Sequence, residues 1–300
     1  MAAPFSAKRS GWQAQAELQQ HWPSLDLSRV CAVGCVVDVA LSAVSYPLWH
    51  LKTREQVLGR GCAQHFRELL HQAGWRGFYR GALFGTFALL PGHCVWYLAY
   101  EGSKWHLTPF FPERTAPAAA AAVAECCYVA CAMPVENVVV RIQCRKASAP
   151  QLRWGASLQE LRRLWQEGGL RRWWNGSLLG LATSLPQSAI WWMVYENSKS
   201  FLLPGTNEAV VKQRSLGAAG AAVLASLVTT FLLNPLDVMK SQVQAASSSS
   251  QVPTAALKQS FSKLFLSGLA PRLMLSGIFG LSDSLSYEAI MYLGRATSPR

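Results

Sequence analysis

Charged and amide side chains recur at fixed distances after three prolines in this 300-residue chain. Each proline ends a run of apolar residues, so these side chains begin where an apolar segment stops. An ionisable group at such a place is a candidate functional group, because burying a charge costs free energy unless the charge is paired. The prolines are Pro47, Pro134 and Pro235; two residues later come Trp49, Glu136 and Asp237, five residues later Lys52, Val139 and Lys240, and nine residues later Gln56, Gln143 and Gln244.

A second pattern follows each proline pattern and contains no gaps. Phe78–Glu101, Trp173–Glu196 and Phe265–Glu288 share one register, in which Gly81, Gly176 and Gly268 align and each stretch ends in Tyr-Glu. Three copies of two linked patterns, in the same order, indicate an internal repeat rather than coincidence.

Six apolar segments must position these residues: 27–48, 82–106, 116–140, 178–203, 211–239 and 269–293. Each is long enough to cross about 30 Å of hydrocarbon at about 1.5 Å per helical residue. The composition agrees, because 51% of the residues are hydrophobic and only 15% are charged, whereas soluble domains carry about 25% charged residues. The sequence therefore predicts an all-α membrane protein and excludes a soluble enzyme.

The formal net charge is +12, and basic residues crowd the connections after the first and third apolar segments. By the positive-inside rule, these two connections face the same compartment. Ordinary solvated loop charge fits this pattern, and contact with an acidic lipid such as cardiolipin is a further alternative.

The remaining motifs exclude several classes of site. The eight cysteines form no C-x-x-C pair and lie mostly in apolar segments, which favours buried thiols over a disulfide framework or a metal site. We find no nucleotide-binding loop, zinc motif or catalytic triad, so no cofactor, no metal and no nucleic-acid partner is expected. Residues 1–26 lack the apolar core of a secretory signal and are predicted to be a polar tail, with a weak transit peptide as the alternative.

The threefold pattern P-x-[DE]-x-x-[KR]-x-[KR]-x-Q resembles the mitochondrial carrier family, over nearly the whole chain from Ser28 to Leu293. The resemblance implies six transmembrane helices in three pseudo-symmetric repeats, at 27–106, 116–203 and 211–293, with a C-terminal tail at 294–300. It also implies a monomeric multi-pass protein of the inner mitochondrial membrane that transports a small-molecule substrate.

In this family, the acid of one repeat pairs with the base of the next repeat at the matrix end of the helices. The resemblance therefore implies a matrix gate with the ion pairs Glu136–Lys240 and Asp237–Lys52, and with glutamine braces at Gln56, Gln143 and Gln244. The third pair would join Trp49 to Val139. Removing one partner of a buried ion pair costs about 3–5 kcal/mol, whereas replacing both partners leaves a neutral contact.

At the opposite ends of the helices, acidic and basic residues are again spaced so that they could pair. "YEGSK" and "YENSK" place an acid and a base three residues apart on one helix face. The resemblance implies a cytoplasmic gate that pairs Glu101 with Lys199 and Glu288 with Lys104, includes Tyr100, Tyr195 and Tyr287, and leaves Glu196 without its usual partner. The simpler alternative is that these residues cap helices at the membrane interface. Two gates at opposite ends imply alternating access to a central site.

Helix phase predicts that central site. Counting seven residues from each repeat glycine gives Ala88, Thr183 beside Ser184, and Leu275, a level with no charge. Multiply charged anions need cations there, so nucleotides and tricarboxylates are disfavoured. Further candidates on the same helices are Asp283 for a substrate ammonium, Trp96 and Trp191 for cation–π contacts, and Arg272 for a carboxylate. Asp283 and Arg272 could instead serve only to pack helices.

A zwitterion with an apolar side chain would satisfy this site. Within the family, "YPLWHLKTREQV" and "LPQSAIWWMVYE" are similar to the carriers of branched-chain amino acids. Asp38 and Glu125 stand nine residues before Pro47 and Pro134; they could relay a proton, bind a cation or accept hydrogen bonds between helices. The alternatives are a carrier of another small solute, coupled or not to protons, and a carrier fold that no longer transports and serves as a membrane scaffold.

Overall fold

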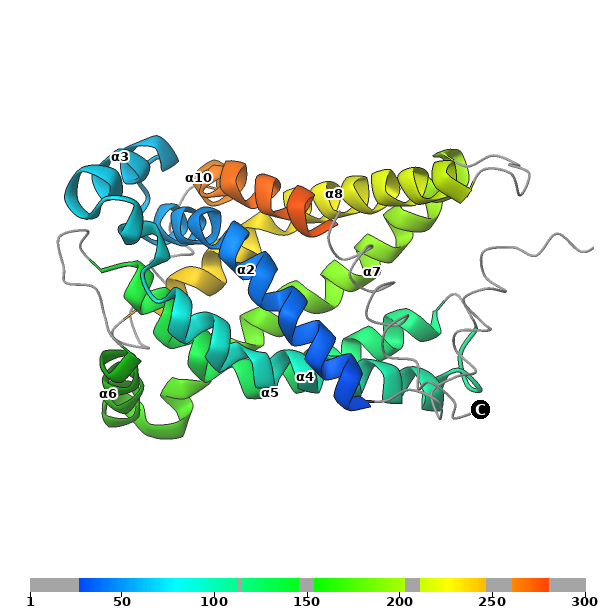
Figure 1. Ribbon diagram of the computed structural model, residues 1–300, viewed down its shortest axis with the longest axis horizontal. Coiled ribbons are helices and arrows are strands. Elements are labelled where there is room, and N and C mark those ends of the chain that lie inside the picture. The colour runs from blue at the N-terminus through cyan, green and yellow to red at the C-terminus, as the bar shows by residue number, and fades with distance from the viewer. Residues whose placement is uncertain (1–26, 113–114, 146–153, 203–210, 247–260, 281–300) are drawn as a thin grey trace, which may run out of the picture.

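The computed structural model describes residues 27–112, 115–145, 154–202, 211–246 and 261–280. The described elements are helices and short turns (Figure 1). They are α2 (Leu27–Leu58), α3 (Cys62–Ala73), the 3-10 helix η2 (Trp75–Tyr79), α4 (Ala82–Leu107), α5 (Ala116–Gln143), α6 (Trp154–Trp173), α7 (Ser177–Leu202), α8 (Val211–Ala245) and α10 (Phe261–Leu266), followed by a further helix over Leu269–Gly280.

The long helices form a ring that follows the chain. α2 packs on α4, α4 on α5, α5 on α7 and α7 on α8, and α8 returns to contact α2. Figure 1 shows α3 and α6 at one end of this bundle, with the first residues of α2, α5 and α8 at the other. All-α architecture, as predicted, is therefore what the described residues show.

Four helical spans are long and apolar enough to cross a membrane: Ser28–Leu58, Trp75–Leu107, Ala118–Gln143 and Ala219–Ala245. α7 is 26 residues long, and the helix Leu269–Gly280 continues to the last residue that the structure describes. Large apolar side chains on the outer faces, such as Val36, Leu83 and Leu178, are mostly exposed. A bundle that is apolar outside as well as inside suits lipid rather than water as its surroundings.

The prolines of the repeat lie inside helices, because α2, α5 and α8 continue past Pro47, Pro134 and Pro235. The sequence prediction ended these segments at residues 48, 140 and 239, but the helices run on to Leu58, Gln143 and Ala245. A bundle tolerates the lost hydrogen bond because neighbouring helices supply partners. Residues two, five and nine positions after each proline then lie within about 60° of one another around one helix, at about 100° per residue.

The aligned glycines Gly81, Gly176 and Gly268 adopt equivalent backbone angles, with φ of 80°, 86° and 67°. This left-handed region strains residues that carry a Cβ atom. A Cβ atom on Gly268 would also lie 2.6 Å from Cγ of Gln56 and 3.2 Å from the Lys52 carbonyl oxygen, both on α2. The glycine therefore permits the last helix to approach α2 closely, beside the predicted gate.

Gly268→Ala is expected to lower the thermal unfolding midpoint of the purified protein more than Gly59→Ala. Both substitutions place a side chain at positive φ, which costs about 1–2 kcal/mol, but a Cβ atom on Gly59 would meet nothing within 4 Å. Crowding against Gln56 adds about 1–3 kcal/mol at Gly268 alone. Thermal unfolding in detergent measures the difference, and equal midpoints for the two variants would contradict the close approach to α2.

Candidate functional site

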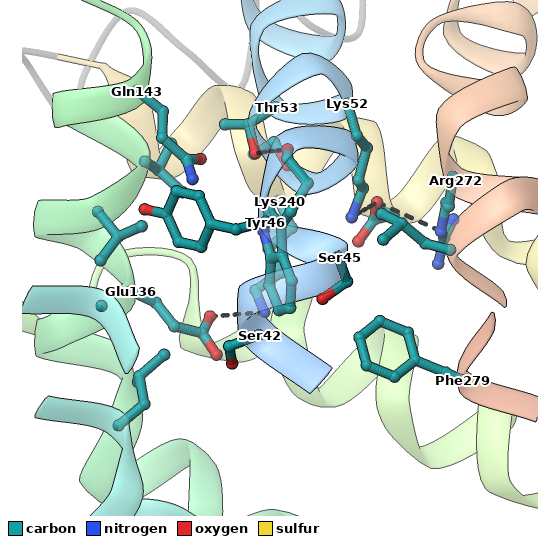
Figure 2. Close-up of a pocket in the computed structure, with 18 of the residues that line it drawn as sticks. Ser42, Ser45, Tyr46, Lys52, Thr53, Glu136, Gln143, Lys240, Arg272 and Phe279 are labelled. Atoms are coloured by element: carbon teal, nitrogen blue, oxygen red, sulfur yellow. Dashed lines mark hydrogen bonds and ion pairs between the residues drawn. The ribbon is translucent and has the colours of Figure 1, made fainter. Parts of the chain in front are cut away.

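A cavity of about 460 Å³ lies between α2, α4, α5, α7, α8 and the helix Leu269–Gly280. Its volume falls in the range of small-molecule sites. Figure 2 shows Glu136, Lys240, Lys52 and Arg272 extending into this space from different helices. The repeat pattern singled out Glu136, Lys240 and Lys52, and Arg272 is the predicted contact for a carboxylate.

One predicted ion pair joins α2 to α8. Nζ of Lys52 lies 2.7 Å from Oδ2 of Asp237. Gln56 donates its Nε2 hydrogen to the same oxygen at 2.8 Å, and Ser241 donates to Oε1 of Gln56 at 2.7 Å. The pairing and its glutamine brace are therefore present as predicted, with Ser241 as an addition that the sequence pattern did not indicate.

The second predicted ion pair joins α5 to α8. Nζ of Lys240 lies 2.9 Å from Oε2 of Glu136, and Gln244 donates to that oxygen at 3.2 Å. The hydroxyl of Tyr128 donates to the other oxygen, Oε1, at 3.2 Å. Each oxygen of this buried carboxylate thus has a partner, which is the condition under which a buried ion pair is tolerated.

The third interface, between α2 and α5, has no charged pair at the repeat positions. Trp49 lines the cavity, and Nζ of Lys52 lies 6.0 Å from the centroid of its ring. Val139 packs among Phe84, Val138 and other apolar side chains between α4 and α5. Direct pairing of Trp49 with Val139 stays a prediction.

His50, which the repeat pattern does not mark, and Arg54, its second basic position, connect α2 to α5. Nε2 of His50 lies 3.1 Å from the Gln143 carbonyl oxygen. Nη1 of Arg54 donates to that oxygen at 3.1 Å and to the Arg145 carbonyl oxygen at 2.7 Å. Within the described residues, the buried amide of Gln143 has no hydrogen-bond partner, in keeping with the missing ion pair that it would brace.

The predicted substrate-site residues of α7 and of the helix Leu269–Gly280 lie on the cavity wall, and their contact with a substrate stays a prediction. Thr183, Ser184, Arg272 and Leu275 all line the cavity. Arg272 is held in place, because its Nε lies 3.4 Å from Oδ2 of Asp237 and its Nη1 donates to Oδ1 of Asn234 at 3.2 Å. Its guanidinium is thus at the boundary between the central site and the Lys52–Asp237 pair.

On α4 the predicted stripe faces a neighbouring helix instead of the cavity. The cavity is lined by Leu89, Leu90 and His93, whereas Ala88 packs against the apolar cluster between α4 and α5. The reason is close packing of small residues: Cβ atoms on Gly85 and Gly92 would lie 3.1 Å from Val139 and 3.3 Å from Ala132. The glycine-based stripe therefore follows the face of α4 that meets α5.

The two tryptophans also pack between helices. Trp96 stacks on Tyr100 with ring centroids 5.2 Å apart, against alanines of α5. Trp191 stacks on Tyr195 at 4.9 Å, and its Nε1 donates to Oγ of Ser226 on α8 at 3.0 Å. Neither ring lines the described cavity, and the role of the two rings as a lining for a substrate ammonium stays a prediction.

Most residues of the predicted cytoplasmic gate lie outside the part of the chain that the structure describes. Tyr100 and Lys104 are buried, with Nζ of Lys104 5.4 Å from the Tyr100 ring centroid, and Glu101 lies one turn away on α4. Asp283, Tyr287 and Glu288 lie outside the described residues, and the side chains of Glu196 and Lys199 are outside them too. The pairing of these residues stays a prediction.

Ion pairs also tie α6 to the end of α5. Nη2 of Arg141 lies 2.9 Å from Oε2 of Glu167, and Nη2 of Arg145 lies 2.6 Å from Oε2 of Glu160. The hydrogen bonds from Arg141 hold the pKa of the Glu167 carboxyl below its ordinary value. Glu167 is more than a third exposed, so this pair belongs to the surface and serves below as a comparison for the buried pairs.

Comparison with known proteins agrees with this architecture. The family model described as "Mitochondrial carrier protein" matches residues 24–110 and 113–205. Among similar curated proteins, human "Solute carrier family 25 member 44" is 27% identical over 256 residues, covering 78% of this chain and 80% of its own.

Two further relatives come from distant organisms. "Mitochondrial carrier protein CoAc1" of Zea mays is 27% identical over 263 residues, covering 79% of this chain and 76% of its own. "Mitoferrin" of Dictyostelium discoideum is 25% identical over 228 residues and covers 71% of each chain. The matched residues, the ring of apolar helices and the two braced ion pairs agree: the chain belongs to the mitochondrial carrier family and is a multi-pass solute transporter of the inner mitochondrial membrane.

Proposed function

We propose that this carrier transports a small zwitterionic amino acid with an apolar side chain, the branched-chain amino acids being the leading candidates. The observation that supports this proposal best is the cavity wall. Thr183, Ser184, Leu89 and Leu275 form a level with polar and apolar surface but no charge, and Arg272 lies one helical turn away. If the substrate carboxylate bound Arg272, the apolar side chain of the substrate would lie against Leu89 and Leu275.

Charge balance in the cavity also favours a solute without net charge. Its described lining contains three cations, Lys52, Lys240 and Arg272, and three anions, Asp38, Glu136 and Asp237, whose formal charges balance. The cations are already engaged with Asp237 and Glu136. A nucleotide or tricarboxylate would have to break these pairs, and it would find no spare cation in the described lining to replace them.

The same contacts support alternating access as the mechanism. The two ion pairs, their glutamine braces and the links from His50 and Arg54 hold α2, α5 and α8 together at one end of the cavity. A substrate carboxylate that binds Arg272 would compete with Asp237, whose Oδ2 is 3.4 Å from Nε of that arginine. Substrate binding would thereby remove one of the two cations that contact Asp237 and loosen the contact of α8 with the helix Leu269–Gly280. A ligand that binds better after this contact has loosened favours one conformation over another.

Uptake by purified carrier in liposomes tests the substrate. Labelled leucine, isoleucine and valine are compared with labelled ADP and citrate, and leucine uptake well above that of empty liposomes is the expected result. ADP or citrate uptake without leucine uptake would overturn the proposal. If protein that unfolds in a cooperative thermal transition takes up none of these solutes, the scaffold alternative is favoured.

Arg272→Gln tests whether Arg272 binds the substrate carboxylate, because loss of binding should appear in KM. We expect leucine uptake to lose about tenfold in kcat/KM, mostly through a higher KM, because a charge-assisted hydrogen bond to a carboxylate is worth about 1.5–3 kcal/mol. Arg272→Lys should recover part of the loss, and Arg76→Gln, which changes an exposed arginine on η2, should behave as wild type. An unchanged KM in Arg272→Gln would remove Arg272 from the substrate site.

A further inference from the structure

A histidine and an acid face each other in the cavity, and the function proposed above uses neither. Nδ1 of His93 on α4 lies 2.9 Å from Oδ2 of Asp38 on α2. Both residues line the cavity, with 32% of the His93 side chain and 16% of the Asp38 side chain exposed. Solutes and protons in the cavity can therefore reach the pair.

The same pair is connected to the predicted matrix gate. The His93 ring stacks on the Tyr128 ring of α5, with centroids 5.5 Å apart and planes 18° apart. The Tyr128 hydroxyl donates to Oε1 of Glu136, whose other oxygen pairs with Lys240. A change in charge at His93 is thus separated from an ion pair of the gate by a single aromatic side chain.

The charged and titratable groups around His93 are mainly acidic. Asp38 faces His93 from α2. On the same helix, Sγ of Cys35 lies 3.6 Å from Sγ of Cys94 on α4. Tyr128 faces it from α5, and Glu125 and Glu136 interact electrostatically with that tyrosine. Lys240 lies behind Glu136 and is already paired with it. Histidine is the side chain that ordinarily changes charge between pH 5 and 8.

We propose that His93 and Asp38 form a proton-binding site of the transport cavity, and that the proton bound there crosses the membrane together with the solute. Binding adds one positive charge to the balanced cavity, and release on the other side restores the balance, so one proton moves per solute. For the identity of the solute this inference rests on the function proposed above. The proton site itself does not depend on that identity.

The first experiment measures protonation directly, without a substrate. In protein labelled with ¹³C at histidine Cε1, the signal that disappears in His93→Asn should shift as the pH falls from 8 to 6. Asp38→Asn should move its midpoint to lower pH, because the protonated ring loses its counter-charge. The proposal would be overturned if the His93 signal does not shift over this pH range. It would also be overturned if the midpoint of that shift is the same in Asp38→Asn as in the wild type.

The second experiment measures coupling. In liposomes that contain a pH-sensitive dye, a leucine gradient should acidify the lumen with wild-type carrier. His93→Asn and Asp38→Asn should abolish this acidification and flatten the pH dependence of uptake, Asp38→Glu should retain most of it, and His71→Asn, on the exposed face of α3, should match wild type.

The outcomes separate the two proposals. Leucine uptake without acidification, or acidification that persists in His93→Asn, would overturn the coupling while leaving the proposed function intact. If the wild type takes up no leucine, the proposed function fails, and the same dye assay with whichever solute of the panel is transported decides the coupling. A carrier that transports none of these solutes would overturn coupling together with transport.

Discussion

Lys240→Glu is expected to reduce solute uptake by roughly 100-fold, and adding Glu136→Lys to the same chain is expected to restore a measurable part. The single change places a second carboxylate beside Glu136, where Nζ of Lys240 now lies 2.9 Å from Oε2. Breaking a buried pair in this way costs about 3–5 kcal/mol. A destabilisation of about 3 kcal/mol lowers the population of the conformation that this ion pair holds closed by roughly 100-fold.

Exchanging both charges restores an ion pair between α5 and α8 with its polarity reversed. Recovery should be incomplete, because Tyr128 and Gln244 now donate hydrogen bonds to the carboxylate at position 136, and a lysine there cannot accept them. Initial rates of uptake in liposomes, normalised to the amount of folded carrier, measure the effect. A double variant no more active than Lys240→Glu would show that the two residues do not act as a pair.

The surface pair provides the matched control for this experiment. Glu167→Gln removes one of the two acids that contact Arg141, but Glu160 and the Ala246 carbonyl oxygen still do, and the pair with Glu167 is partly exposed between α6 and the end of α5. Exposed ion pairs contribute about 0–1 kcal/mol. Uptake by Glu167→Gln should therefore stay within about twofold of the wild type.

Val139→Lys is expected to cost most of the uptake, and Trp49→Glu in the same chain is expected to return part of it. Val139 is 7% exposed and packs between α4 and α5, so a lysine there buries a cation among apolar side chains. An uncompensated buried charge costs several kcal/mol. An acid at position 49 on α2, on the cavity wall, would supply the partner that the other two repeats provide by sequence.

Two further variants make the Val139 result interpretable. Val139→Ile preserves the apolar packing and should retain most of the uptake, whereas Trp49→Glu alone should lose activity because its carboxylate has no cation to meet except the engaged Lys52. Uptake and the thermal unfolding midpoint are measured together for all four variants. If the double variant is no better than Val139→Lys, positions 49 and 139 do not face each other at the third interface.

The helices could be predicted from the apolar segments, and the two ion pairs from the resemblance to the family. The predicted segments agree with α2, α4, α5, α7 and α8, except that α2, α5 and α8 run on past the predicted ends at residues 48, 140 and 239. Long apolar runs have one stable form in lipid, which is why composition was sufficient for the helices. The pairs Glu136–Lys240 and Asp237–Lys52 were implied by the resemblance to the mitochondrial carrier family, in which the acid of one repeat pairs with the base of the next, and both contacts are present.

Tertiary structure alone decided which face of α4 meets the cavity. An error of one residue turns a helix by about 100°, and that turn separates Ala88, which packs towards α5, from Leu89 on the cavity wall. The links from His50 and Arg54 to the Gln143 carbonyl also escaped the sequence, because a backbone acceptor has no sequence signature. The contact of His93 with Asp38 joins residues 55 apart, and only the packing of α2 on α4 brings them together.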